Sequence, residues 1–176
     1  MLDFLSNIKK KDPVQPTLLE VILCYPGAHV MFFHRIANLL YRLNIPILPR
    51  FLSNIASILT GIEIHPGAKI GKRIFIDHGT GIVIGETSVI GDDVTIYHGV
   101  TLGGSGKISD KKRHPTIGNS VIIGAGAKVI GDINIGDEAK IGPNAIIVKN
   151  MAKKKILVAP TSEGITKKNY EIEYFI

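Results

Sequence analysis

The amino-acid sequence predicts a mainly β protein, a left-handed parallel β-helix of hexapeptide repeats with a short α-helical region before it. Between residues 61 and 150 an aliphatic residue returns at every sixth position for most of the length. A helix would need a period of 3.6 residues and a hairpin strand a period of 2. A six-residue period, usually with glycine or a polar residue after the aliphatic one, indicates short strands wound into a solenoid.

Two sets of apolar positions carry this pattern, and we expect both to fill the core of the solenoid. The first set is Ile64, Ile70, Ile76, Ile84, Ile90, Ile96, Leu102, Ile117, Ile123, Val129, Ile135, Ile141 and Ile147. The second set lies two residues before most members of the first and is Ala68, Ile74, Ile82, Val94, Val100, Val121, Ala127, Ile133, Ala139 and Ala145.

Two exceptions to the six-residue step indicate where the chemistry lies. One step is eight residues long and spans the segment 77–81, and another is fifteen residues long and spans the loop 103–115. Insertions into repeat proteins form loops, and such loops often carry the binding site. The sequence therefore predicts functional residues in these two segments.

The composition fits one domain with an appendage. The chain has 176 residues, of which 45% are apolar, so it can bury a sizeable core. We expect an N-terminal helical region at residues 1–60, a β-helix domain at residues 61–150 that carries the loop 103–115, and a C-terminal tail at residues 151–176.

Cysteine content and hydropathy favour a cytoplasmic protein without a membrane span. Cys24 is the single cysteine, so an intramolecular disulfide is excluded. No N-terminal apolar stretch precedes a small-residue cleavage site, and the most apolar run, residues 39–62, is interrupted by Arg42, Arg50 and prolines. The formal net charge is +6, but the basic residues lack interleaved aromatics, which favours a small polyanionic ligand over nucleic acid.

The N-terminal region predicts helices that close one end of the solenoid. Apolar residues at three- and four-residue steps indicate two helices within residues 17–43, separated by a Pro-Gly pair, and a third helix at about residues 48–59. The first dozen residues, with lysines at 9–11, are expected to be solvated and partly frayed. A terminal coil exposes apolar core and unpaired backbone, so we expect the helices to cover it.

Glu63 and His78 are expected to share a corner of the solenoid. If three hexapeptides make one turn, Glu63 precedes one face and His78 lies in the turn leading to the same face one coil later. Adjacent coils are about 4.8 Å apart, so the carboxylate can come within hydrogen-bonding reach of the imidazole. Such a pair makes a general base for an alcohol nucleophile. A surface ion pair is the alternative reading.

Several runs of the sequence carry a resemblance to a known family. They are GIEIHPGAKIG at 61–71, IDHGTGIVIGET at 76–87, GVTLGGSGK at 99–107, RHP at 113–115 and IGAGAK at 123–128. With these runs the chain resembles the serine O-acetyltransferases of the hexapeptide-repeat acyltransferase superfamily over roughly residues 13–148. The resemblance implies acetyl transfer from acetyl-CoA to the hydroxyl of L-serine, which gives O-acetyl-L-serine for cysteine biosynthesis.

The resemblance also implies catalytic and substrate-binding roles. His78 would be the general base that takes the proton from the serine hydroxyl, and Glu63 would be the carboxylate that orients it. Asp77, Arg113 and His114 match positions that hold the substrate amino acid. The arginine guanidinium is well suited to clamping a carboxylate.

Acetyl-CoA is the co-substrate that the resemblance implies. Gly104 and Ser105 leave the coil where backbone N–H groups can stabilise an oxyanion, although a flexible loop stem would look the same. Ala125 matches a small residue along which the pantetheine arm lies. Lys140 is a candidate phosphate contact, with an ordinary surface lysine as the alternative.

A metal site is the competing interpretation of the histidines. His98 follows its aliphatic position as His78 does one coil earlier, so the two imidazoles are expected to lie near each other. Because no third ligand has a matching spacing, we expect no metal.

Two other functions stay open at this point. Pro16 stands where the family often has an aspartate that holds the substrate amine, which favours an O-acetyltransferase acting on a sugar or polysaccharide hydroxyl. The altered repeat after residue 148 favours a non-catalytic scaffold. Asp77, Arg113 and His114 oppose the first reading, and the intact His78 corner opposes the second.

The resemblance further implies partners. Members are usually homotrimers, in which a neighbour's loop completes the site, and a higher assembly such as a hexamer stays open. Some insert a C-terminal isoleucine into cysteine synthase, and this chain ends on Ile176. Capture of a terminal carboxylate by backbone N–H groups is the physical basis.

Overall fold

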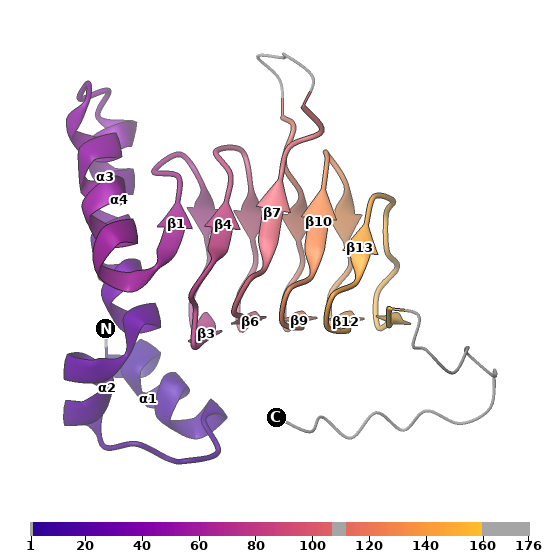
Figure 1. The fold of residues 1–176 in the computed structure, drawn as a ribbon, viewed down its shortest axis with the longest axis horizontal. Coiled ribbons are helices and arrows are strands. Elements are labelled where there is room, and N and C mark those ends of the chain that lie inside the picture. The colour runs from indigo at the N-terminus through magenta and orange to yellow at the C-terminus, as the bar shows by residue number, and fades with distance from the viewer. Residues whose placement is uncertain (1, 107–111, 160–176) are drawn as a thin grey trace.

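The computed structural model describes residues 2–106 and 112–159 and confirms the predicted architecture. Helices lie at one end, and the rest of the described chain winds into a parallel β-helix (Figure 1). Within the described part of the chain, none of the helices is both long and apolar enough to cross a membrane.

The N-terminal region contains one more helix than the sequence predicted. The helices are α1 (Leu2–Lys11), α2 (Leu18–Cys24), α3 (Pro26–Arg42) and α4 (Leu48–Thr60). The expectation of a solvated, frayed start is wrong, because Leu5 and Ile8 of α1 are buried against α2, α3 and β3 (Phe75–Asp77). The lysines that suggested fraying occupy the last turn of α1, where cations stabilise the helix dipole.

The boundaries of the helices follow from local chemistry. Thr17 caps α2 in a capping box, in which the N–H of Glu20 donates to its hydroxyl and its own N–H donates to the carboxylate of Glu20. Pro26 is the first residue of α3, where its missing N–H costs nothing. Helix α4 ends at Gly61, whose φ of 70° suits glycine.

Three parallel sheets form the three faces of the solenoid. The strands of the first sheet are β1 (Ile62–Ile64), β4 (Ile82–Ile84), β7 (Thr101–Gly103), β10 (Lys128–Ile130) and β13 (Ile146–Ile147). Those of the second are β2 (Lys69–Ile70), β5 (Val89–Ile90), β8 (Thr116–Ile117) and β11 (Asn134–Ile135). Those of the third are β3, β6 (Thr95–Tyr97), β9 (Ile122–Ile123), β12 (Lys140–Ile141) and β14 (Ile156–Leu157). Strand β14 pairs with β12, so the coil extends into the segment assigned to the tail.

The turns between the sheets form three corners that position the functional residues. We name them in chain order. The first corner joins the first sheet to the second and includes residues 65–68, 85–88, 104–106 and 112–115. The second corner joins the second sheet to the third, at residues 71–74, 91–94, 118–121 and 136–139. The third corner joins the third sheet back to the first, at residues 78–81, 98–100, 124–127 and 142–145.

The predicted core positions are confirmed. Every member of both aliphatic sets is buried, none with more than 8% of its surface exposed. In the first sheet, like residues stack directly on one another, with Ile64 paired to Ile84, Ile84 to Leu102, and Leu102 to Val129. Each coil therefore buries its neighbour's apolar face, as expected for a repeat protein.

Helices α3 and α4 cover the open end of the solenoid, as predicted (Figure 1). Val30 and Met31 of α3 and Ala56 of α4 join the same buried cluster as the first coil. A Cβ atom at Gly27 would lie 2.8 Å from the carbonyl oxygen of Ile76, so glycine allows α3 to approach the backbone of β3.

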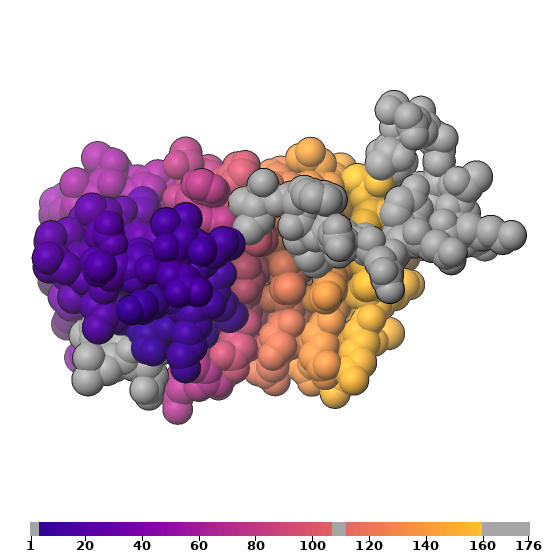
Figure 2. All heavy atoms as spheres, turned by 90° about the horizontal axis from the view of Figure 1, so that it is seen from below, coloured from indigo at the N-terminus to yellow at the C-terminus, as the bar shows by residue number. Residues whose placement is uncertain are grey.

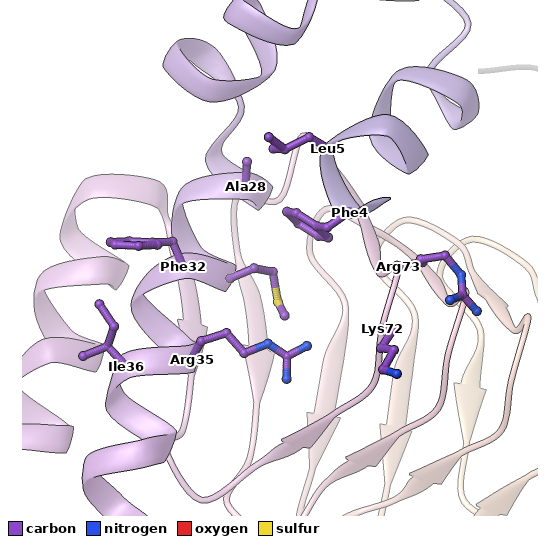
Figure 3. Close-up of a pocket in the computed structure, with 9 residues that line it drawn as sticks. Phe4, Leu5, Ala28, Phe32, Arg35, Ile36, Lys72 and Arg73 are labelled. Carbon is purple, nitrogen blue, oxygen red and sulfur yellow. The ribbon is translucent and has the colours of Figure 1, made fainter. Parts of the chain in front are cut away.

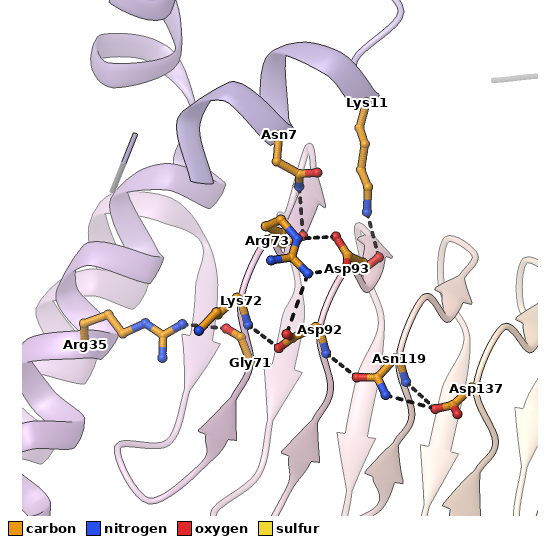
Figure 4. A network of polar contacts seen from close by, with 10 residues as sticks. All are labelled: Asn7, Lys11, Arg35, Gly71, Lys72, Arg73, Asp92, Asp93, Asn119 and Asp137. Atoms are coloured by element: carbon orange, nitrogen blue, oxygen red, sulfur yellow. Dashed lines mark hydrogen bonds and ion pairs between the residues drawn. The ribbon is translucent and has the colours of Figure 1, made fainter. Parts of the chain in front are cut away.

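The second corner is held by a ladder of side chains that bond to the backbone of the preceding coil (Figure 4). Asp92 accepts from the N–H of Lys72 at 2.7 Å, and Asn119 accepts from the N–H of Asp92 at 2.8 Å. Helix α1 is tied to this corner, because Lys11 donates to the carbonyl of Asp93 at 2.7 Å. These bonds satisfy turn backbone that the strands leave unpaired.

Candidate active site

The eight-residue step forms a turn at the third corner that presents His78 to solvent. His78 has a φ of 58°, and the N–H of Gly79 donates to the carbonyl of Asp77 at 2.7 Å across it. A Cβ atom at Gly79 would lie 2.5 Å from the side chain of Ile62, so the turn requires glycine there. The imidazole is 67% exposed, which leaves it accessible to a substrate.

His78 and His98 stack at this corner, as the spacing predicted. Their ring centroids are 5.8 Å apart and the rings meet edge to face at 79°. Within residues 2–106 and 112–159, no group of three or more His, Cys, Asp or Glu side chains could hold a metal ion.

Asp77 is the carboxylate that lies within ion-pair distance of the imidazole. Its Oδ1 lies 3.9 Å from Nε2 of His78, and its side chain is 18% exposed. Burial and the charge of Asp77 raise the pKa of the neighbouring Tyr97. Glu63 lies on β1 opposite Val83 with an exposed side chain. The described residues show no hydrogen bond or ion pair between Glu63 and His78.

The first corner holds His114 in a defined orientation. Nδ1 of His114 accepts from the N–H of Thr87 at 3.2 Å and lies 2.9 Å from its hydroxyl oxygen. In the neutral ring the proton is therefore on Nε2. Burial lowers the pKa of His114, and the positive charge of Arg113 lowers it further. A Cβ atom at Gly85 would lie 2.0 Å from the ring, so the imidazole rests directly on that glycine.

Arg113 is anchored beside His114. Its Nη2 lies 3.2 Å from Oε2 of Glu86, and its backbone N–H donates to the Thr87 hydroxyl at 3.0 Å. Glu86 and Thr87 were not among the predicted site residues. The feature that could have identified them is the run GET at 85–87, which lies inside the segment that carries the resemblance.

The residues assigned to acetyl-CoA are divided between the corners. Gly104 lies beside His114 at the first corner, where a Cβ atom would be 3.3 Å from Nε2. Ala125 lies at the third corner, where its carbonyl accepts from the N–H of Asn144 at 2.8 Å. Ser105 follows Gly104 in the loop, and Lys140 begins β12 in the third sheet.

One chain therefore holds two half-sites at different edges of a triangular prism. Asp77, His78 and Ala125 lie at the third corner, whereas Arg113 and His114 lie at the first. The candidate general base and the candidate carboxylate clamp lie at different corners of the described chain.

A cavity elsewhere in the molecule is distinct from both half-sites (Figure 3). It has a volume of about 520 Å³ and lies between α1, α3 and the second corner. Its walls include Phe4, Met31 and Phe32, with Arg35 and Lys72 at its edge. None of its lining residues belongs to the predicted site.

Comparisons with known proteins identify the family. Residues 114–149 match the family model described as bacterial transferase hexapeptide (six repeats). The serine acetyltransferase of Helicobacter pylori is 51% identical over 170 residues, which cover 95% of this chain and 99% of that protein. The chain belongs to the serine acetyltransferase family. The enzyme of that name from Mycobacterium tuberculosis is 56% identical over 157 residues, 89% of this chain and 68% of the relative.

Solved structures of the family share the fold. Serine acetyltransferase isoform 3 of Entamoeba histolytica, in complex with cysteine, matches with a TM-score of 0.86 and 44% identity over 95% of this chain. The Neisseria gonorrhoeae enzyme, in complex with serine, matches with a TM-score of 0.84 and 40% identity over 88% of this chain. The matched regions are 60% and 63% of those longer chains.

Proposed function

We propose that this protein is an acetyl-CoA-dependent serine O-acetyltransferase that converts L-serine and acetyl-CoA to O-acetyl-L-serine and CoA, a step that serves cysteine biosynthesis. The observation that carries the proposal is the 51% identity to a serine acetyltransferase over 99% of that relative's length. The two half-sites supply the side chains that this chemistry needs. Serine is also the ligand of a solved relative.

The proposed reaction uses His78 as the general base. The imidazole takes the proton of the serine hydroxyl as the oxygen attacks the thioester carbonyl of acetyl-CoA. The new C–O bond forms, the C–S bond breaks, and the protonated imidazole returns the proton to the departing thiolate of CoA. The exposure of the ring at the tip of a tight turn supports this role, because a general base must approach the proton that it takes.

Two carboxylates are proposed to support His78. Asp77 is close enough to stabilise the imidazolium and to attract the ammonium group of serine. Glu63 is proposed as the orienting carboxylate, which requires its exposed side chain to turn toward the ring. A Glu63→Gln variant with unchanged kcat would assign the orienting role to Asp77 alone.

Arg113 and His114 are proposed to bind the carboxylate of serine. The guanidinium can donate two parallel hydrogen bonds to a carboxylate, and the Nε2–H of His114 adds a neutral donor. Gly104 and Ser105 are proposed to offer backbone N–H groups to the oxyanion. Ala125 is proposed to line the path of the pantetheine arm and Lys140 to contact a phosphate of CoA.

Thiol release from acetyl-CoA tests the proposal. We expect release with L-serine and none with a panel of sugars, because the matched relatives are named serine acetyltransferases. His78→Ala should lower kcat by about 10²–10⁴-fold, the usual contribution of general base catalysis, while CoA binding persists. Wild-type turnover by that variant would refute the mechanism.

We also propose that the enzyme acts in the cytoplasm. We propose that it is a homotrimer, because only a second chain can bring a first corner to the third corner of its neighbour.

The proposed cysteine synthase contact through Ile176 lies outside the described residues. Deletion of Ile176 should abolish binding of the synthase and leave acetyl transfer intact. Equal binding by both forms would refute the tail contact.

A further inference from the structure

A chain of three side chains joins the helical cap to the candidate substrate clamp. The hydroxyl of Tyr41, on α3, donates to Oε1 of Glu86 at 3.0 Å. The other carboxylate oxygen, Oε2, accepts from Nη2 of Arg113 at 3.2 Å. We propose that Tyr41 and Glu86 are positioning residues that fix the Arg113 guanidinium for the carboxylate of the amino-acid substrate. This inference rests on the proposed function of Arg113.

Tyr41 makes two separate contacts, one through its ring and one through its hydroxyl. Its ring meets the imidazole of His65 edge to face, with centroids 5.9 Å apart and an angle of 81°. His65 is itself oriented, because its Nδ1 accepts from the N–H of Gly67 at 3.0 Å. The phenol ring, which is 39% exposed, therefore packs on the imidazole beside the first corner.

Gly67 allows the three side chains to converge. A Cβ atom there would lie 3.1 Å from Cγ of Glu86, 3.2 Å from the Tyr41 ring and 3.2 Å from Nδ1 of His65. Contacts this close require a neighbour to move. The absence of a side chain at this position is thus part of what holds the carboxylate of Glu86 between Tyr41 and Arg113.

The pKa of Tyr41 agrees with a Glu86 carboxylate that two donors share. The hydrogen bond to Glu86 raises the pKa of Tyr41, and burial and the charge of Glu86 raise it further. The phenol therefore remains a donor at neutral pH. With both oxygens engaged, the carboxylate has little freedom to turn away from Arg113.

The contact with Glu86 leaves most of the Arg113 guanidinium available to bind a ligand. Nη2 is the guanidinium nitrogen that contacts Glu86. The remaining nitrogens, Nε and Nη1, have no hydrogen-bond partner in residues 2–106 and 112–159. A guanidinium held at one nitrogen loses less conformational freedom when it binds a carboxylate, so positioning improves affinity without touching the reacting atoms.

Tyr41→Phe is the sharpest test because it removes the hydroxyl and keeps the ring against His65. We expect the KM for serine to rise roughly two- to fivefold, because the variant keeps the ion pair of Glu86 with Arg113 and loses only one exposed hydrogen bond. The kcat and the KM for acetyl-CoA should stay unchanged, because the lost interaction serves ground state and transition state alike. The melting temperature should also stay unchanged, which a purely structural role would not predict.

A double-mutant cycle shows whether Tyr41 acts through Glu86. Glu86→Gln should raise the serine KM at least as much as Tyr41→Phe, and the double variant should match Glu86→Gln alone. Asp93→Asn is the matched control, since it disrupts another carboxylate–arginine pair, with Arg73 at the second corner. It should leave the serine KM unchanged.

The outcomes separate the inference from the proposed function. An unchanged serine KM in Tyr41→Phe, or additive effects in the double variant, would overturn the positioning role. If Arg113→Ala raises the serine KM under those conditions, the clamp stands and only the positioning role is wrong. A wild-type enzyme that releases no thiol with serine would overturn both.

Discussion

His78 occupies a left-handed backbone conformation that residues other than glycine seldom adopt. The left-handed region recurs at the corners of this solenoid, for example at Arg73, Asp93 and Glu138. At the second corner these residues lie in turns whose backbone groups bond to the preceding coil. At the third corner, the step has two extra residues, and the turn at Gly79 leaves His78 exposed. The same local strain thus serves a turn in one place and exposes a candidate base in another.

Gly85→Ala is the residue-level prediction for the first corner. The new methyl group would lie 2.0 Å from the His114 ring, so the imidazole must leave its place on the glycine and its contact with Thr87. We expect kcat/KM for serine to fall at least about tenfold, since a lost hydrogen bond to a charged group costs about 1.5–3 kcal/mol.

The comparison with His114→Ala checks that explanation. The double variant Gly85→Ala/His114→Ala should be no worse than His114→Ala, because the methyl group acts only by displacing the ring. A Gly85→Ala enzyme with normal serine kinetics would show that the position of His114 is unimportant.

At the scale of elements, the six-residue period predicted the strands and the core. The aliphatic positions define the strands and core because every coil repeats the same burial. Helix α1 was missed because its buried face is only Leu5 and Ile8, and the lysines at 9–11 dominate its composition. The two insertions contain His78, Arg113 and His114, whose roles stay predictions. The contact of Glu86 with Tyr41 spans 45 positions and depends on how the cap docks, so no local pattern predicts it.

Ile8→Ala tests whether α1 is docked on the solenoid. Ile8 is 2% exposed, and truncating a buried isoleucine usually costs about 2–5 kcal/mol. We expect faster amide hydrogen exchange throughout α1 and little change in the core strands. Lys9→Ala, on the exposed side of the same helix, is the control. Equal exchange in the wild type and Ile8→Ala would mean that α1 is undocked in solution.

Helix α3 carries a buried histidine that makes the stability of the cap depend on pH. Burial lowers the pKa of His34 to about 4 from 6.5, with the charge of Arg35 as the next cause. The folded state therefore binds fewer protons than the unfolded chain below pH 6.5, and stability falls as the pH drops toward 4. The loss is on the order of 2–3 kcal/mol.

Chemical denaturation at several pH values measures this effect. His34→Gln should weaken the pH dependence between 6.5 and 4 relative to the wild type, because the titrating group is gone. Burial also lowers the pKa of His65 and of His114, so some dependence of the same sign should remain. A variant with the full wild-type dependence would assign the effect to those residues instead.

At the scale of the whole molecule, the triangular cross-section separates the two half-sites. The candidate base lies at the third corner and the candidate carboxylate clamp at the first, with the width of the first sheet between them. Since the rigid coils fix this separation, the proposed site would be completed by the first corner of another chain. A closed three-fold ring would form three equivalent sites of this kind.

Mixing inactive subunits tests the shared site. If each site takes His78 from one chain and Arg113 from the next, any trimer that mixes His78→Ala and Arg113→Ala chains contains one intact site. Random mixing in equal amounts would then restore about a quarter of the wild-type activity. Mixing His78→Ala with Asp77→Ala should restore none, because both residues come from the same corner of the same chain. Mixed trimers, verified with two affinity tags, that recover no activity in the first mixture would show that one chain completes its own site.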